Sequence, residues 1–92
     1  MTQKDLAEHA SRWVSPIAVD YRDLQVFEIP PNGQGIAALI ALGILRHHDL
    51  AQYAMDSDDS IHLQVEAMKI ALCETYHHIA DPACMRLDHQ RL

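Results

Sequence analysis

Sulfur and imidazole side chains gather in the C-terminal third of the chain, where Cys73 and His77 lie four residues apart and His78 and Cys84 follow. A thiol and an imidazole at this helical spacing are candidates for a nucleophile and its base. With the run His47-His48-Asp49, the same groups are candidate zinc ligands. Zinc sites are typically built from closely spaced pairs such as C-x₂-C, and no such pair here is matched by a second. We therefore expect no metal site here. Since no oxyanion hole or orienting group accompanies the thiol, we expect no catalytic residue either.

A glycine-punctuated turn, Asn32-Gly33-Gln34-Gly35, follows Pro30-Pro31 and opens into an apolar run. The prolines end a strand because they lack an N–H group, and the glycines tolerate positive φ, which lets the chain turn sharply into a helix. Backbone N–H groups at a helix start can bind an anion, so Asn32, Gly33, Gln34 and Gly35 are the candidate ligand-binding residues. The turn lacks the Gly-Lys-Ser/Thr ending of a P-loop and the dinucleotide spacing. We therefore favour a structural turn, with ligand contact as the alternative.

Three acidic residues, Asp58, Asp59 and Glu66, are conceivable partners in acid–base catalysis. Carboxylates in the first turn of a helix are, however, the ordinary means of stabilising it. No apolar pocket around them argues for a raised pKa. We expect a solvated helix start.

Composition indicates one small domain, residues 1–92, with a modest core. The net charge of −6 repels phosphate backbones and anionic lipid, so we expect neither nucleic acid nor membrane as a partner. The longest apolar stretch, residues 36–45, is too short to span a bilayer. Two cysteines, which could pair, make no disulfide framework. Nothing in the sequence calls for a cofactor.

The N-terminal segment predicts a short helix from Thr2 to about Trp13, because Thr2 and Asp5 can cap its start and Pro16 prevents its continuation. One face of this helix collects Leu6, His9, Ala10 and Trp13. We expect this face to place Trp13 against the core.

Residues 16–29 follow a period of two and predict a β-hairpin with Arg22-Asp23 as its turn. The expected pairs are Val19 with Val26, Tyr21 with Leu24, Ile17 with Glu28, and Ala18 with Phe27. Both faces carry apolar residues, so we expect the hairpin to join a larger sheet.

The next predicted helix, from about Gln34 to His47, is apolar all round over residues 36–45 except at Gly43. Such a helix requires burial on every side. Because a chain this short cannot cover it fully, we expect association with copies of the chain or with another subunit through this helix.

The last predicted helix runs from about Ser57 to Ala80 and stops before Asp81-Pro82. Its expected core stripe is Ile61, Val65, Met68, Leu72, Tyr76 and Ile79. The tail, residues 83–92, has no clear period and is expected to be disordered or to form a short helical turn.

Three motifs together carry a family resemblance: the run from Glu28 to Ile40, Asp56-Ser57-Asp58, and His62 to Lys69. Over Lys4 to Pro82 the chain resembles the gamma-glutamyltranspeptidase family of N-terminal nucleophile hydrolases. The resemblance implies an α+β fragment, with a short helix, a β-hairpin and two longer helices, of the four-layer αββα fold. The matched segment lies within the large subunit, upstream of the autoprocessing site.

The resemblance also implies the parent reaction, which is transfer or hydrolysis of the gamma-glutamyl group of glutathione-like donors through a threonine nucleophile. That threonine opens a Thr-Thr-His-type segment, whereas the chain contains only Thr2 and Thr75, in other contexts. Cys73 to His78 also departs from the Ala-Asp-Arg-aromatic pattern common in the family. No catalytic residue is therefore carried over.

We expect a non-catalytic scaffold that forms a homo-oligomer or pairs with a missing catalytic subunit. The alternative is an independent small-ligand or protein-binding module without enzymatic activity. Family members are usually exported, and the polar start at Met1 shows no signal peptide. We therefore expect a truncated or excised segment.

Overall fold

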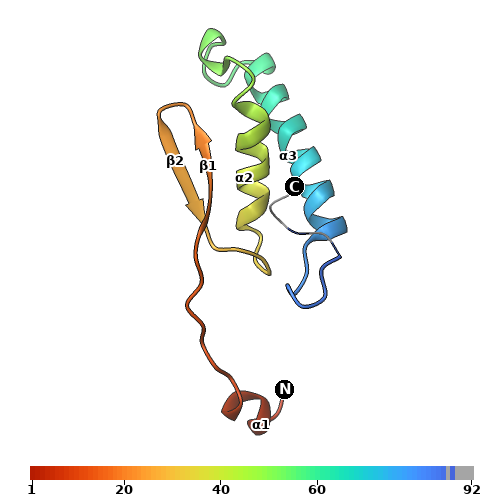
Figure 1. Cartoon of the computed structure of the whole chain (residues 1–92). Helices are drawn as coiled ribbons and strands as arrows, with labels where there is room; N and C mark the ends of the chain where they lie inside the picture. Colours follow the sequence, from red (N-terminus) through yellow and green to blue (C-terminus); the bar gives the residue numbers. More distant parts are fainter. Residues whose placement is uncertain (87, 89–92) are drawn as a thin grey trace.

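The computed structural model describes residues 1–86 and 88, and it confirms an α+β arrangement (Figure 1). The elements in chain order are α1 (Gln3–Ala7), β1 (Ile17–Tyr21), β2 (Leu24–Glu28), α2 (Gly35–Leu45), the 3₁₀-helix η1 (Leu50–Gln52) and α3 (Asp58–His78). The predicted tail begins with a turn in which the Cys84 N–H donates to the Asp81 carbonyl at 2.7 Å. Residues 87 and 89–92 of that prediction lie outside the described residues.

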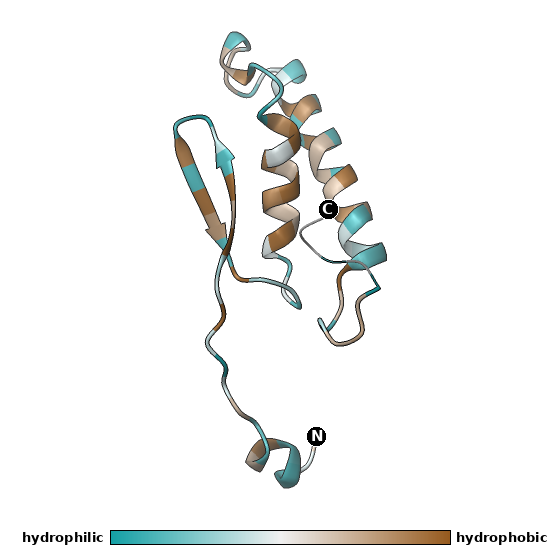
Figure 2. Cartoon of the chain, viewed as in Figure 1, coloured by the Kyte–Doolittle hydropathy of each residue, from teal (hydrophilic) through white to brown (hydrophobic). Residues whose placement is uncertain are grey.

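Helix α2 occupies the middle of the molecule, with the hairpin on one side and α3 on the other (Figures 1 and 2). This position follows from its sequence, because a helix that is apolar all round must contact neighbours on several faces. The core consists of Ile36, Ala37, Leu39, Ala41 and Leu45 from α2 and Ala67 and Ala71 from α3. The remaining residues of α2 are half-buried. The two neighbours therefore cover α2 in part, as expected of a chain this short, and association through this helix stays a prediction.

The β-hairpin has the predicted register, with Val19 opposite Val26 and Tyr21 opposite Leu24. The face toward α2 carries half-buried Val19 and Val26. On the opposite face, Phe27 is 57% exposed. Within residues 1–86 and 88 the sheet has two strands, so this outer face is uncovered.

Arg22 connects the hairpin tip to the segment after α2. Its backbone has φ 58, one of two positive values at non-glycine residues in the described chain. Its side-chain Nη2 donates to the His48 carbonyl at 2.9 Å and lies 3.6 Å from Asp49 Oδ1. The guanidinium also lies 5.7 Å from the centre of the Tyr21 ring. These contacts hold a backbone conformation that is costly for an L-residue.

Helix α3 contacts α2 through small side chains, and the predicted core stripe is wrong. Ser60, Ala67, Ala71 and Thr75 are the buried residues of α3. Along the expected stripe, Ile61, Val65, Met68 and Tyr76 are exposed, and Leu72 and Ile79 are half-buried. The buried row is offset from the predicted row by one residue, or about 100° around the helix. The row of small side chains faces α2 because it lets α3 approach the bulky residues of α2 closely.

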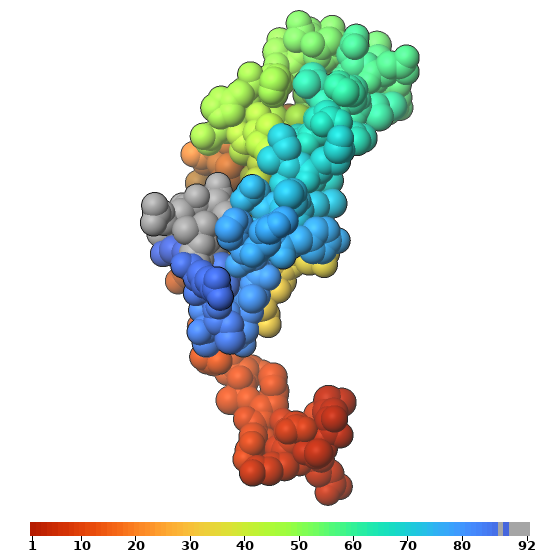
Figure 3. All heavy atoms as spheres, turned by 90° about the vertical axis from the view of Figure 1, so that its right-hand side faces the viewer, coloured from red at the N-terminus to blue at the C-terminus, as the bar shows by residue number. Residues whose placement is uncertain are grey.

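The N-terminal helix is shorter than predicted and lies apart from the rest of the chain (Figures 1 and 3). Thr2 and Asp5 form the expected cap: the Thr2 N–H donates to the Asp5 carboxylate at 2.6 Å, and this hydrogen bond lowers the pKa of Asp5. The helix ends at Ala7, and Trp13 is fully exposed on the extended segment that follows. The prediction that Trp13 reaches the core is wrong, because no described element packs against this segment.

The turn does not use the positive φ that Gly33 and Gly35 would tolerate. All three lie within the described residues, and none has positive φ. Gly35 instead provides space, since a Cβ atom there would fall 2.7 Å from the Glu28 Cδ. At Gly43 a Cβ would meet only the Val19 Cγ2, at 3.9 Å, which is ordinary contact.

Substituting Gly43→Ala is expected to stabilise the chain by about 0.5–1 kcal/mol, because alanine fits the available space and favours the helix. The measurement is the free energy of unfolding in urea. Val19→Ala in combination with Gly43→Ala serves as the control for a steric conflict. A loss of stability in Gly43→Ala that Val19→Ala relieves would contradict the prediction.

Arg22→Ala is expected to be less stable than the parent chain by roughly 1 kcal/mol, because the hydrogen bond to His48 and the partly exposed ion pair are lost. Arg22→Gly loses the same contacts but removes the strain at positive φ. Its free energy of unfolding should therefore be about 1 kcal/mol higher than that of Arg22→Ala. Equal stability of the two variants would show that the backbone there is unstrained.

Candidate functional site

The predicted ligand-binding turn, Asn32 to Gly35, leads directly into α2. Asn32 and Gln34 are exposed, and Gly33 and Gly35 are half-buried. Gln34 is the N-cap residue, and among the described residues its side chain makes no capping hydrogen bond. Its carbonyl accepts from the Ala37 N–H at 2.9 Å. The structure thus brings the four residues together at a helix start, where backbone N–H groups are available.

The Glu28 side chain already lies over this helix start. Its carboxylate is the nearest group to the position a Cβ would take on Gly35. A carboxylate at the positive end of a helix is electrostatically favourable and repels a second anion. The arrangement favours a structural role for the turn, and ligand contact there stays a prediction. The sequence analysis missed Glu28, which the hairpin register places on the α2 side of the sheet.

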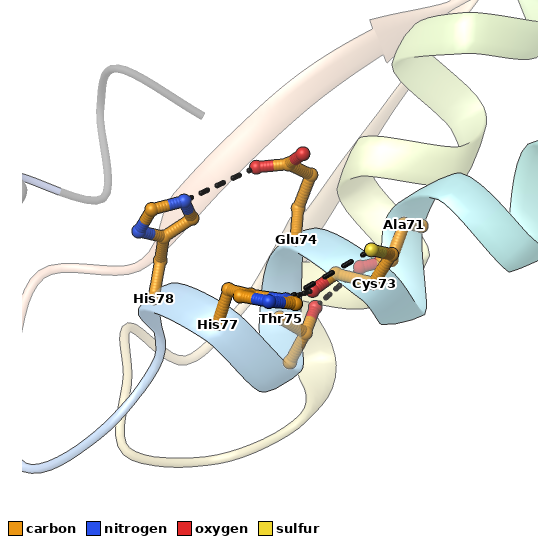
Figure 4. A network of polar contacts seen from close by, with 6 residues as sticks. All are labelled: Ala71, Cys73, Glu74, Thr75, His77 and His78. Carbon is orange, nitrogen blue, oxygen red and sulfur yellow. Dashed lines mark hydrogen bonds and ion pairs between the residues drawn. The ribbon is translucent and has the colours of Figure 1, made fainter.

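Cys73 and His77 lie on the same face of α3, as their spacing predicts (Figure 4). The Cys73 Sγ and His77 Nδ1 are 3.9 Å apart, but the same nitrogen lies 2.9 Å from the Cys73 carbonyl oxygen. A carbonyl oxygen can only accept a hydrogen bond, so Nδ1 carries a hydrogen in this contact. It therefore cannot also take a proton from the thiol, which argues against a thiol–imidazole nucleophile.

The other candidate ligands do not converge. His78 Nε2 lies 3.5 Å from Glu74 Oε2 on the same helix (Figure 4). Cys73 and Cys84, both in the described chain, are free thiols. Over residues 1–86 and 88, no three His, Cys, Asp or Glu side chains are grouped so that they could hold a metal ion.

No helix in this part of the chain is long and apolar enough to cross a membrane.

The three acidic candidates are also apart. Asp58 and Asp59 lie exposed at the start of α3. Glu66 accepts a hydrogen bond from the Lys69 ammonium at 2.7 Å, and this bond lowers the pKa of Glu66. A general acid needs a raised pKa, so Glu66 is not tuned for that task.

Both threonines are engaged in structural hydrogen bonds. The Thr2 hydroxyl donates to the Asp5 carboxylate at 2.9 Å in the exposed cap of α1. Thr75 is buried against α2, and its hydroxyl donates to the Ala71 carbonyl at 2.7 Å (Figure 4). The Asp5 carboxylate also accepts from the Thr2 N–H in this exposed cap, and the partner of the Thr75 hydroxyl is a backbone carbonyl, which is too weak a base to activate it.

The sequence analysis also missed a groove of about 780 Å³ between β1 and α2. Ile17, Val19 and Ile40 are among the apolar residues that line it, and Arg46 and His47 lie at its polar end. The Arg46 Nε donates to the His47 Nε2 at 3.4 Å, so these polar groups meet each other. The sequence signal for this groove is the free edge of β1 beside a helix that is apolar all round.

Glu28→Gln is expected to destabilise the chain by about 0.3–1 kcal/mol, because it removes a negative charge from the positive end of α2. Urea unfolding at low ionic strength measures the change, and added salt should reduce it. The control is Asp23→Asn at the hairpin turn, away from this helix start. A Glu28→Gln chain as stable as Asp23→Asn would show that the carboxylate does not interact with α2.

Known proteins resemble this chain in sequence and in fold. The family model described as gamma-glutamyltranspeptidase matches residues 1–92. The chain is 35% identical over 92 residues to the glutathione hydrolase-like YwrD proenzyme of Bacillus subtilis, covering 100% of the chain and 18% of that protein. It is 32% identical over 93 residues to the glutathione hydrolase proenzyme of Escherichia coli, covering 100% of the chain and 16% of that protein.

A solved structure shares the fold. The crystal structure of Helicobacter pylori gamma-glutamyltranspeptidase superimposes with a TM-score of 0.88 at 22% identity, over 98% of this chain and 26% of that one. The chain thus spans less than a fifth of the length of each of these two relatives. Since the family model extends over every residue and the hairpin, turn and helices recur in the solved structure, the chain belongs to the gamma-glutamyltranspeptidase family.

Proposed function

We propose that this chain is a framework segment of an enzyme that hydrolyses or transfers the gamma-glutamyl group of glutathione-like donors. The two relatives are a glutathione hydrolase-like protein and a glutathione hydrolase, which supports this substrate class. In this proposal the segment positions other parts of the enzyme and does not itself attack the substrate.

The observation that carries the non-catalytic role is the use of both threonines. The family resemblance implies a threonine nucleophile, and a nucleophile needs a free hydroxyl beside a base. Thr75 is 6% exposed, with its hydroxyl bound to the Ala71 carbonyl, and Thr2 caps a short helix far from the core. The attacking group would therefore come from polypeptide outside these 92 residues.

The uncovered surfaces support a place within a larger fold. Phe27 lies exposed on the outer face of the hairpin, and apolar residues line the groove along β1. A two-stranded sheet with an apolar outer face is stabilised by further strands or by a second sheet. This is the setting expected of one α and one β layer of an αββα sandwich. The isolated chain, which lacks these further layers, is proposed to self-associate.

The alternative function, an independent binding module, draws its support from the groove between β1 and α2. An apolar cleft of this size can hold a small ligand when a few polar groups converge on it. Here Arg46 bonds to His47, and Arg22 takes the His48 carbonyl, so the polar groups near the groove have partners within the chain. The framework role is the better supported of the two.

A chimera tests the framework role. In the Escherichia coli glutathione hydrolase proenzyme, the matching 93 residues are replaced by this chain, and self-cleavage and hydrolysis of a gamma-glutamyl anilide are measured. We expect both activities to persist, while the isolated chain releases no product above buffer. Activity of the isolated chain that Thr75→Val abolishes would contradict the proposal.

Two leucine substitutions provide matched controls within the chimera. Ala71→Leu overfills the contact between α2 and α3, where Ala71 is 0% exposed, and should cost about 1–3 kcal/mol and reduce activity. Ile70→Leu, at a residue that is 51% exposed, should leave activity unchanged. If both variants behave alike, the framework formed by α2 and α3 has no bearing on catalysis.

A further inference from the structure

A continuous apolar row runs along one flank of α3 and is not used in the contact with α2. It consists of Ile61, Val65, Met68, Leu72 and Tyr76, and is called the outer stripe below. Leu72 is half-buried, while the other four residues are 41–77% exposed. Figure 3 views the molecule from the α3 side and shows the helix extending along that face. Spacings of four and three residues are those of a helix seam that packs against another helix.

The outer stripe is nearly symmetric about a point between Met68 and Lys69. Residues equally far from that point are Ile61 and Tyr76, and then Val65 and Leu72. If two copies of α3 pack antiparallel about a twofold axis there, each large apolar side chain faces another, and the two Met68 side chains meet at the axis. Self-complementarity of this kind is the requirement for an isologous dimer.

The charges at the two ends of α3 favour the antiparallel arrangement. The helix begins with Asp58 and Asp59 and ends with His77 and His78. A parallel pair would bring four carboxylates together, whereas an antiparallel pair keeps the acidic ends of the two helices apart. The two helix dipoles then also oppose each other favourably. Lys69 would flank the axis in both copies, and its bond to Glu66 at 2.7 Å neutralises it locally.

The area available indicates a weak pair. With about 200 Å² for a fully exposed side chain of this size, the stripe offers on the order of 400 Å² per copy. A standard stable interface buries about 800 Å² per partner, so this contact is of the weak, concentration-dependent kind.

We propose that the outer stripe of α3 is a self-association surface through which two copies of this chain form an antiparallel, twofold-symmetric dimer. The proposal rests on the proposed self-association of the framework segment and moves its site from α2, where the sequence placed it, to α3. The partner is a second copy, because the spacing of the stripe is symmetric about its centre and an antiparallel pair of copies separates the acidic helix starts.

The test uses the full 92-residue chain with Cys73→Ser and Cys84→Ser, studied by sedimentation across a concentration series. The parent chain is expected to show a monomer–dimer equilibrium. Met68→Glu places two carboxylates at the axis and should raise the dissociation constant of the dimer by at least about tenfold. Ile70→Glu introduces the same charge on the other flank of α3, at a residue of similar exposure. It should change the dissociation constant by less than about twofold. Circular dichroism confirms that both variants fold.

Disulfide trapping tests the antiparallel geometry. In the same background, Met68→Cys should cross-link efficiently with itself. A mixture of Ile61→Cys and Tyr76→Cys chains should give the mixed cross-linked species in preference to either self-linked one. Preferential Ile61→Cys self-linking would show a parallel pair and overturn the proposed geometry.

A monomer at every concentration, or equal weakening by Met68→Glu and Ile70→Glu, would overturn the dimer. The stripe would then be a contact with polypeptide outside these 92 residues. That result would leave the framework role standing, because the chimera's activity measures it separately. Loss of activity in the chimera together with an intact dimer would reject the framework role alone.

Discussion

The packing of α2 against the small side chains of α3 is the constraint on which the rest of the structure depends. Ala67 and Ala71 are 2% and 0% exposed, and they leave room for the bulky aliphatic residues of α2. With α3 on one side, α2 can accept the hairpin on the other, and a helix that is apolar all round becomes compatible with water. The same choice of small residues turns the larger apolar side chains of α3 away from the core, so the uncovered surface of the molecule follows from its buried contact.

Local patterns predicted the elements well, and their tertiary partners poorly. The hairpin register followed from alternation and a two-residue turn, and Val19 pairs with Val26 as expected. Helix α3 presented two adjacent rows with the same spacing, and hydrophobicity selected the wrong one. Periodicity gives the angle between rows but not which row meets a neighbour, since that depends on the side chains of α2. The prediction that Trp13 reaches the core is wrong for a related reason. An apolar helix face is buried only where another element packs against it, and the described chain has no such element near α1.

The candidate site was predictable in its location and less so in its contents. Proline and glycine placed the turn before α2, yet the carboxylate over Gly35 comes from Glu28, seven residues earlier, and only the hairpin geometry reveals it. The family resemblance located the chain within a known enzyme fold, and the comparisons established the family. The hydrogen bond of Thr75 could not be predicted from the sequence, because a threonine within a helix is equally compatible with a free hydroxyl and with one bonded to the preceding turn.

The Arg22 contact has a mechanical consequence for α2. The short Pro-Pro connection joins β2 to the first residue of α2, and the Arg22 side chain joins the hairpin tip to the residues just after its last turn. The hairpin and α2 are thus connected to each other near both ends of the helix. Movement of either end of α2 away from the sheet would break one of these attachments, so we expect the hairpin and α2 to move together as one unit.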